Sequence, residues 1–214
     1  SEQSDTLGPY VRTGATAQTT PVLLPAGLTT GRDITGVNLF ENVRKQSALN
    51  LDGSSYAEVH DNASLDVTTA VTLEAWVYWD DTQSSVGILG KWNTTSTQCY
   101  LIYSASNSRA QFYISSTGAN AQEVEFTIPS NGWVHIVGTE DGTNHKLYIN
   151  GTEEATKASL GSIFTNNRVL EIGRYDENIA REYGNQLAQP RIYNRALSAE
   201  EIQRNYNAGK NIYS

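Results

Sequence analysis

Short runs of alternating hydrophobic and polar residues, separated by turn residues, fill most of the chain from Ala48 onward. Such runs are typical of an all-β sandwich or jelly roll. The expected strands cover residues 48–51, 56–59, 71–79, 86–89, 100–103, 111–114, 124–128, 133–139 and 145–149. The pattern therefore predicts one all-β domain.

Residues 71–79 carry bulky side chains on both faces of the predicted strand, which favours a central position in a sheet. Residues 141–144 read as a hairpin turn, and Asn150-Gly151 is the sequence signal of a tight type I′ turn. The second half of the domain is therefore expected to form consecutive hairpins.

A single helix is predicted near the C-terminus. Ser198 and Glu201 have the spacing of a capping box, and Leu197 can pack against Ile202 as a hydrophobic staple. Gly209 is a suitable C-terminal stop. We expect this helix to close one end of the sandwich.

Residues 1–46 show no sustained periodicity and contain little apolar surface. Such a segment does not offset its own ordering entropy, so it reads as an extended N-terminal arm. The predicted organisation is an arm over 1–46, which docks the protein on assembly partners, and a domain over 47–214. Packing of the arm on its own sandwich is the alternative.

Charge and cysteine content exclude several classes of protein. The 15 Lys+Arg and 23 Asp+Glu give a net charge of −8, which repels phosphate backbones and argues against a nucleic-acid partner. The apolar runs fall short of the ~20 residues of a membrane-spanning helix, so no membrane insertion is expected. Cys99 is the only cysteine and can form neither an intrachain disulfide nor a zinc cage.

Five segments, in order along the chain, resemble the laminin-G-like domain of the concanavalin A-like lectin and glucanase superfamily: residues 48–53, 73–77, 132–137, 146–151 and 191–202. The resemblance implies a two-sheet antiparallel jelly roll used mostly for binding and adhesion, and in some branches for glucan hydrolysis. It also implies that Trp76 and Trp133 occupy buried core positions.

Glucan-cleaving relatives carry carboxylates at alternate positions of one strand, and Glu123-Val124-Glu125 is the nearest match. Alternation puts the two carboxylates on one face with Cα atoms ~7 Å apart. The middle Asp and the second spacing of the motif are missing, and the histidines lie in different strands, with His135 read as a packed strand residue. No catalytic residue is therefore predicted, and a glycosidase is the weakest alternative.

Relatives often bind calcium through an Asp near the opening strand and acids in the final strand. Asp52 is the only candidate ligand here, because Ala188 and Gln189 stand where the acids would be. Calcium requires several charged oxygens. No cofactor is therefore expected, and Asp52 otherwise serves the turn before Gly53.

Three residues are the predicted ligand-binding set. Trp79, at a strand end, and Trp92, in the loop 91–94, are additional to the family core, and Asn93 adjoins Trp92. An exposed indole stacks on the apolar face of a sugar, and a neighbouring amide binds hydroxyls. Alternatively, Trp92 anchors its loop or a subunit contact.

Two functions follow. The first is a non-enzymatic structural and adhesive protein, docked by its arm on a larger assembly such as a bacteriophage capsid or tail, where it touches surface glycans. The second is a carbohydrate-binding module of a secreted bacterial enzyme or adhesin, in which the arm is a linker. Both place the protein on a virion surface or outside the cell, and both rest on fold analogy.

Overall fold

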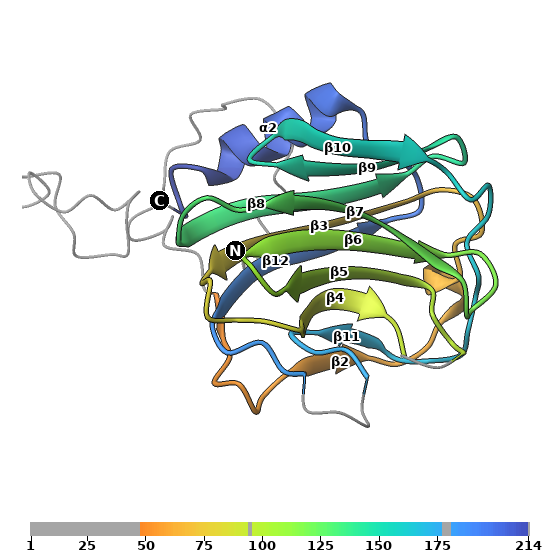
Figure 1. Ribbon diagram of the computed structural model, residues 1–214, viewed down its shortest axis with the longest axis horizontal. Helices are drawn as coiled ribbons and strands as arrows, with labels where there is room; N and C mark the ends of the chain where they lie inside the picture. The colour runs from red at the N-terminus through yellow and green to blue at the C-terminus, as the bar shows by residue number, and fades with distance from the viewer. Residues whose placement is uncertain (1–47, 94–95, 177–180, 214) are drawn as a thin grey trace, which may run out of the picture. The chain divides into compact units, whose positions relative to one another are not determined.

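The computed structural model describes residues 48–93, 96–176 and 181–213. Within this part of the chain, twelve strands form two six-stranded sheets in which every pair of neighbouring strands is antiparallel, as the ribbon shows (Figure 1). The sandwich confirms the predicted all-β fold. The predicted arm over 1–46 lies outside the described residues, so its boundary with the domain stays a prediction.

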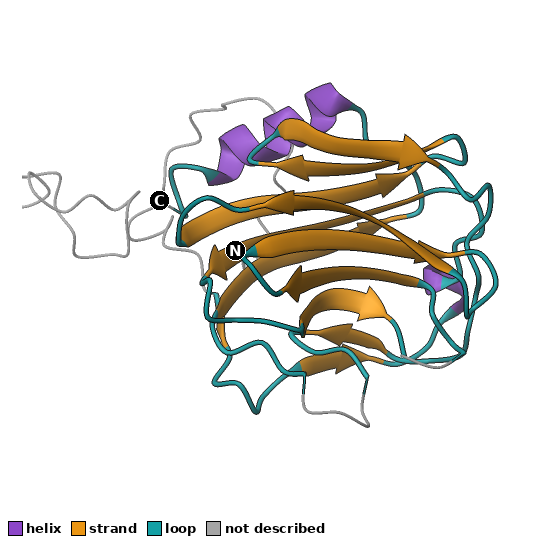
Figure 2. Ribbon diagram, in the orientation of Figure 1, coloured by secondary structure: helices purple, strands orange, loops and turns teal. Residues whose placement is uncertain are grey.

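Each sheet mixes strands from distant parts of the chain. In sheet order, sheet A consists of β1 (Leu49–Asn50), β12 (Gln186–Tyr193), β3 (Val71–Trp79), β8 (Gly132–Glu140), β9 (Asn144–Ile149) and β10 (Thr152–Ala158). Sheet B consists of β2 (Ala57–Val59), β11 (Leu170–Ile172), β4 (Val86–Lys91), β5 (Tyr100–Ala105), β6 (Arg109–Ser115) and β7 (Ala121–Thr127). The helices are the short 3-10 turn η1 (Ala63–Leu65) and α2 (Ala199–Gly209) (Figure 2).

The hairpins of the second half are confirmed. Residues 141–143 join β8 to β9, and Asn150 (φ 51°) and Gly151 (φ 83°) form the turn between β9 and β10. Both turn residues have the positive φ that a type I′ turn requires. The alternation did not predict β10, which is almost wholly exposed and polar, or β11, which has only three residues.

Helix α2 begins as predicted but covers a different surface. The Ser198 side chain accepts from the backbone N–H of Glu201 at 3.3 Å, and the Glu201 carboxylate accepts from the backbone N–H of Ser198 at 2.9 Å. Leu197 and Ile202 are buried together against Val137 of β8 and Tyr148 of β9. The expectation that the helix closes one end of the sandwich is therefore wrong: it lies on the outer face of sheet A, where Val137 and Tyr148 offer apolar contacts.

Gly209 is the last residue of α2, but its role is not the predicted one of a left-handed cap. The cap residue, Lys210, is right-handed (φ −58°), so no left-handed glycine terminates α2. A Cβ on Gly209 would lie 2.5 Å from the indole nitrogen of Trp76. The glycine is needed for close approach of the helix to this ring.

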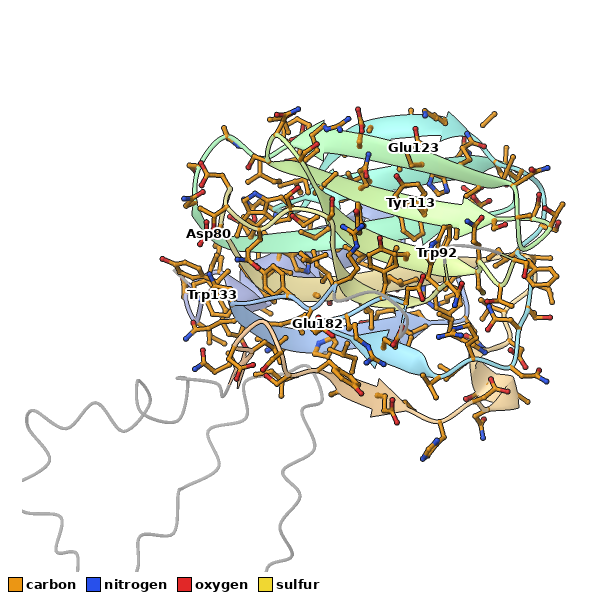
Figure 3. All side chains as sticks on the ribbon, turned by 60° about the horizontal axis from the view of Figure 1, so that its bottom comes forward. Asp80, Trp92, Tyr113, Glu123, Trp133 and Glu182 are labelled. Atoms are coloured by element: carbon orange, nitrogen blue, oxygen red, sulfur yellow. The ribbon has the colours of Figure 1, made fainter. Side chains whose placement is uncertain are left out.

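Trp76 and Trp133 lie on the outer face of sheet A, the face that carries α2, and not between the two sheets. Trp76 is fully buried, as expected, whereas Trp133 is only partly buried in the same cluster. By contrast, the outer face of sheet B carries no helix in the described part of the chain, and Figure 3 shows Trp92 and Tyr113 on it.

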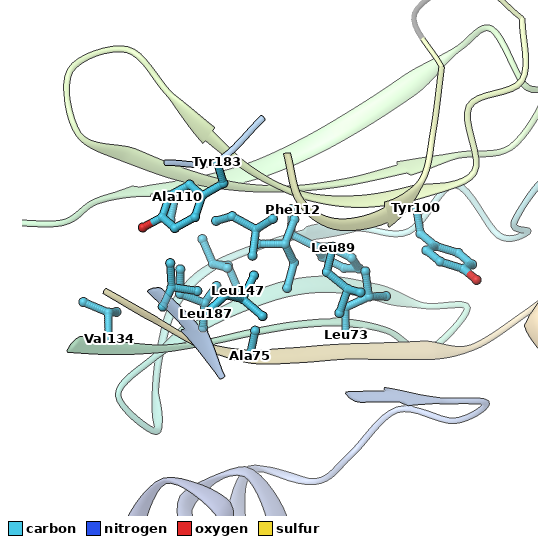
Figure 4. Packing of buried hydrophobic residues seen from close by; sticks show 14 of the residues in the cluster. Leu73, Ala75, Leu89, Tyr100, Ala110, Phe112, Val134, Leu147, Tyr183 and Leu187 are labelled. Carbon is cyan, nitrogen blue, oxygen red and sulfur yellow. The ribbon is translucent and has the colours of Figure 1, made fainter. Parts of the chain in front are cut away.

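The main core fills the space between the two sheets (Figure 4). Sheet A contributes Leu73, Ala75, Val134, Leu147 and Leu187, and sheet B contributes Leu89, Tyr100, Ala110 and Phe112. The nine-residue strand β3 pairs with both β12 and β8, which confirms its central position. This core makes the sandwich a rigid base for side chains on its outer faces.

Candidate ligand-binding site

A pocket of about 190 Å³ opens on the outer face of sheet B. Its lining is mostly aromatic and consists of Trp92, Gln98, Leu101, Tyr103, Tyr113 and Tyr175. Figure 3 shows Trp92 and Tyr113 close together on this face. Such a pocket suits a small ligand that has both apolar faces and hydroxyl groups.

The sheet register brings the lining residues together. Leu101 of β5 lies opposite Tyr113 of β6, on the side of the sheet away from the core residue Phe112. Trp92 follows the last residue of β4, and Tyr175 comes from the segment after β11. The pocket therefore combines two strand positions with two flanking segments.

Gly87 permits the approach of Tyr175. A Cβ on Gly87 would lie 2.5 Å from the backbone of Arg174 and of Tyr175, so the segment after β11 crosses β4 directly over this glycine. Gly87 lies opposite Tyr103 in the register of β4 and β5. The crossing thus places Tyr175 next to Tyr103.

The four aromatic rings meet at steep angles. Trp92 and Tyr113 have ring centroids 5.4 Å apart and planes tilted by 55°. Tyr103 makes T-shaped contacts with Tyr113 at 6.1 Å and with Tyr175 at 5.2 Å. This edge-to-face packing is favourable, and it orients faces and hydroxyl edges of different rings toward one space.

A buried polar link holds the two flanking segments. Asn93, next to Trp92, donates a side-chain N–H to the carboxylate of Asp176, next to Tyr175, at 3.3 Å. The backbone N–H of Asp176 donates to Glu171 at 3.1 Å, and Glu171 also pairs with Arg174 at 2.6 Å. Since Asn93 is only 7% exposed, its observed contact positions the two aromatic segments, whereas direct contact with a ligand stays a prediction.

The Tyr113 hydroxyl belongs to a second polar chain. It donates to the side-chain oxygen of Gln111 at 3.0 Å, and Gln111 donates to Glu125 at 2.6 Å. Burial, with the nearby charges of Glu123 and Glu125, raises the pKa of Tyr113 to about 12. The phenol therefore stays protonated and its ring is fixed.

The predicted ligand-binding tryptophans lie in very different places. Trp92 is 5% exposed and forms a wall of the pocket. Trp79 is 1% exposed, lies in the main core and donates its indole N–H to the Ser108 hydroxyl at 2.7 Å. The expectation of exposed indoles is wrong for both tryptophans. Trp79 shares the core face of β3 with Leu73, Ala75 and Val77, and Trp92 is buried in a cluster with Leu101 and Tyr175.

The sequence interpretation missed Gln98, Tyr103, Tyr113 and Tyr175. Tyr103 and Tyr113 each follow a core residue, Ile102 and Phe112, so strand alternation could have placed both on the outer face. Nothing in the local sequence indicates that Tyr175 reaches them.

The carboxylates considered for glycan hydrolysis lie on β7 beside the pocket. Glu123 is opposite Tyr113 and 3.4 Å from Lys157, and Glu125 pairs with Arg109 at 2.8 Å. The hydrogen bond from Gln111, with the contact to Arg109, lowers the pKa of Glu125. A glycosidase acid requires a raised pKa, so Glu125 is not suited to that role.

Asp52 is engaged in its own turn. Its carboxylate accepts from the hydroxyls and backbone N–H groups of Ser54 and Ser55, and the Ser55 hydroxyl bond is the main cause that lowers its pKa to about 2. Residues 48–93, 96–176 and 181–213 contain no group of three or more His, Cys, Asp or Glu side chains that could hold a metal ion. The expectation that no cofactor binds, with Asp52 as the only candidate calcium ligand, stays a prediction.

A jelly roll with an aromatic pocket on one open outer face is a lectin-like binding fold. The family model of the concanavalin A-like lectin/glucanases superfamily matches residues 51–203, and the chain belongs to this family. None of the curated protein sequences matches it. No helix in the described part of the chain is long and apolar enough to cross a membrane.

Several solved structures have a similar fold. The binding domain of botulinum neurotoxin serotype G aligns with a TM-score of 0.58 and 16% identity over 75% of this chain and 42% of that chain. The binding domain of Paraclostridial Mosquitocidal Protein 1 aligns with a TM-score of 0.58 and 19% identity over 76% of this chain and 45% of that chain. The ligand-binding domain of botulinum neurotoxin serotype D, solved in complex with N-acetylneuraminic acid, aligns with a TM-score of 0.57 and 20% identity over 75% of this chain and 41% of that chain. The chain thus spans less than half the length of these structures, and the similarity shows the fold.

Proposed function

We propose that this protein is a non-enzymatic carbohydrate-binding protein that binds glycans through the aromatic pocket of sheet B. The observation that carries the proposal is the convergence of four aromatic rings, from β5, β6 and the segments after β4 and β11, on one pocket. Sugar rings present apolar C–H faces to aromatic rings and hydroxyls to polar side chains.

The size of the pocket limits the ligand. Its volume of about 190 Å³ is below the roughly 300–1,000 Å³ of pockets for drug-sized ligands. We therefore expect it to hold one sugar ring, such as the end or a branch of a glycan, while the remaining residues of the glycan extend over the sheet.

Family and fold neighbours support a binding role over catalysis. The similar structures are binding domains, and one was solved with a sialic acid. An adhesive role outside the cell or on a virion, with docking through residues 1–46, is the broader hypothesis, and only the sequence supports that docking. A module of a secreted enzyme or adhesin would use the same pocket.

The test is a glycan array probed with the full chain and two tyrosine variants. Tyr113→Ala removes a pocket ring, and Tyr78→Ala removes a tyrosine that is 38% exposed on sheet A, away from the pocket. We expect the wild type and Tyr78→Ala to bind the same glycans, and Tyr113→Ala to bind them at least about tenfold more weakly, about 1.4 kcal/mol. Equal binding by all three proteins, or no binding to any glycan, would contradict the proposal.

A further inference from the structure

Among the residues that the structure describes, the lining of the pocket carries no charged side chain. It consists of an indole, three phenols, a leucine and the amide of Gln98. Proteins recognise carboxylate, sulfate and phosphate groups through Arg, Lys or convergent backbone N–H groups, which form charge-assisted hydrogen bonds. The walls of this pocket offer none of these cationic side chains.

Carboxylates flank the pocket on two sides. Glu123 lies opposite Tyr113 across the β6–β7 pair, and Asp176 follows Tyr175 directly. The cations beside them are paired, Arg109 with Glu125, Arg174 with Glu171, and Lys157 with Glu123 itself at 3.4 Å. An anionic ligand would therefore approach against negative neighbours on a chain whose net charge is −8.

One cation, Arg181, lies near enough to Tyr175 to counteract the effect of burial, the main cause that raises the pKa of that tyrosine. Its guanidinium donates to the backbone carbonyl of Ser85 at 3.3 Å, and Arg181 does not line the pocket. Arg181, beside Tyr175, and Arg109, which acts in the same way on Tyr113, are therefore the nearest cations that an acidic ligand would meet.

Gln98 offers an acceptor to the ligand. Its side-chain oxygen is buried and accepts no hydrogen bond from any residue in the described ranges. An unsatisfied buried acceptor is unfavourable, and a donor from a ligand would satisfy it. The side chain is half-buried and lines the pocket. A sugar hydroxyl can donate to it, whereas the ionised carboxylate of an acidic sugar can only accept.

We infer that the pocket selects neutral sugars and discriminates against acidic ones such as sialylated or sulfated glycans. This inference rests on the proposed glycan-binding function and specifies its ligand. It separates this chain from the serotype D neurotoxin domain of similar fold, which was solved with N-acetylneuraminic acid.

The test compares matched glycan pairs that differ only by a terminal N-acetylneuraminic acid, titrated against the full chain. We expect the capped member of each pair to bind at least tenfold more weakly than the uncapped member. Equal or tighter binding of the capped glycans, abolished by Arg181→Ala, would overturn the inference while leaving the glycan-binding function intact. Failure of every glycan to bind would instead overturn the proposed function, and this inference with it.

Two variants of Gln98 test the acceptor. Gln98→Leu removes the oxygen and is expected to weaken the neutral glycan about tenfold, whereas Gln98→Glu keeps an acceptor and is expected to retain binding within about threefold. Thermal melting of both variants verifies folding. Unchanged binding of the neutral glycan by Gln98→Leu, or loss of its binding by Gln98→Glu, would contradict the assignment of Gln98 as the acceptor.

Discussion

The outer faces of the two sheets both carry aromatic and polar side chains, yet only one of them is open. On sheet A, Trp76, His135 and Tyr148 lie under α2 or next to it and are buried. On sheet B, Tyr103 and Tyr113 line a pocket that no helix of the described residues covers. The outer face of sheet A is thus covered by the protein's own helix, whereas the outer face of sheet B is the surface that we propose to bind glycans.

The outer face of sheet A, which α2 covers and which we call the sealed face, contains a buried carboxylate. Glu74 of β3 is 1% exposed on its side chain and accepts hydrogen bonds from Arg191 at 2.8 Å, Tyr193 at 3.1 Å and Asn205 of α2 at 2.9 Å. His135 contacts it at 3.0 Å. Burial would raise the pKa of Glu74, but these partners outweigh it and lower the pKa below 4.5. Every contact here stabilises the fold.

The largest difference between the two faces is expected from matched tryptophan substitutions, one on each face. Trp76→Ala removes the ring on which Gly209 rests and is expected to lower the free energy of unfolding by about 3–5 kcal/mol. Trp92→Ala should cost less stability, because its ring borders an open pocket, but should abolish glycan binding. Chemical denaturation measures the loss of stability in each variant, and glycan titration measures the loss of binding. Equal loss of stability with binding retained in Trp92→Ala would refute it.

The next effect concerns pH and the sealed face. Because the folded-state pKa of Glu74 lies below 4.5, its carboxylate stabilises the fold above that pH, and this stabilisation is lost as the pH falls through the lowered pKa. Glu74→Gln should therefore be less stable than wild type by about 2 kcal/mol at pH 7, and the gap should shrink below pH 4.5. Denaturation curves at pH 7 and pH 3 give the two gaps. A gap independent of pH would rule out the charge as its source.

A smaller effect should follow from Gly209→Ala, which pushes one methyl group into the Trp76 indole. We expect a loss of about 1–3 kcal/mol from overpacking, although alanine is the better helix former. Ala208→Gly, at an exposed position beside it, serves as the matched control for helix propensity. A stability gain in Gly209→Ala would show that α2 does not rest closely on sheet A.

The smallest effect on binding is expected from deletion of residues 1–46. The truncated chain keeps both sheets and α2, so it should melt cooperatively and bind glycans with unchanged affinity. If the arm docks the protein, incorporation into its parent assembly should be lost. Aggregation of the truncated chain would instead mean that residues 22–28 complete the core and that the boundary is misplaced.

Local signals in the sequence predicted the sheets, the type I′ turn and the start of α2, because each depends on neighbouring residues. The alternation that placed Leu73, Ala75 and Val77 in the core also applied to Trp79, so its burial could have been predicted. The pocket could not be predicted in full, because Tyr175 reaches Tyr103 only where the backbone crosses Gly87. The position of α2 likewise depends on contacts between distant segments, such as Asn205 with Glu74.

The central claim, that sheet B binds glycans and sheet A is sealed, is tested most directly by fluorine NMR of the full chain with fluorinated tryptophan. The chain contains four tryptophans, whose signals are assigned by single Trp→Phe variants. On titration with a neutral glycan identified on the array, the account predicts that the signal of Trp92 moves while those of Trp76, Trp79 and Trp133 stay in place. A shift at Trp76 or Trp133 with Trp92 unmoved would contradict it.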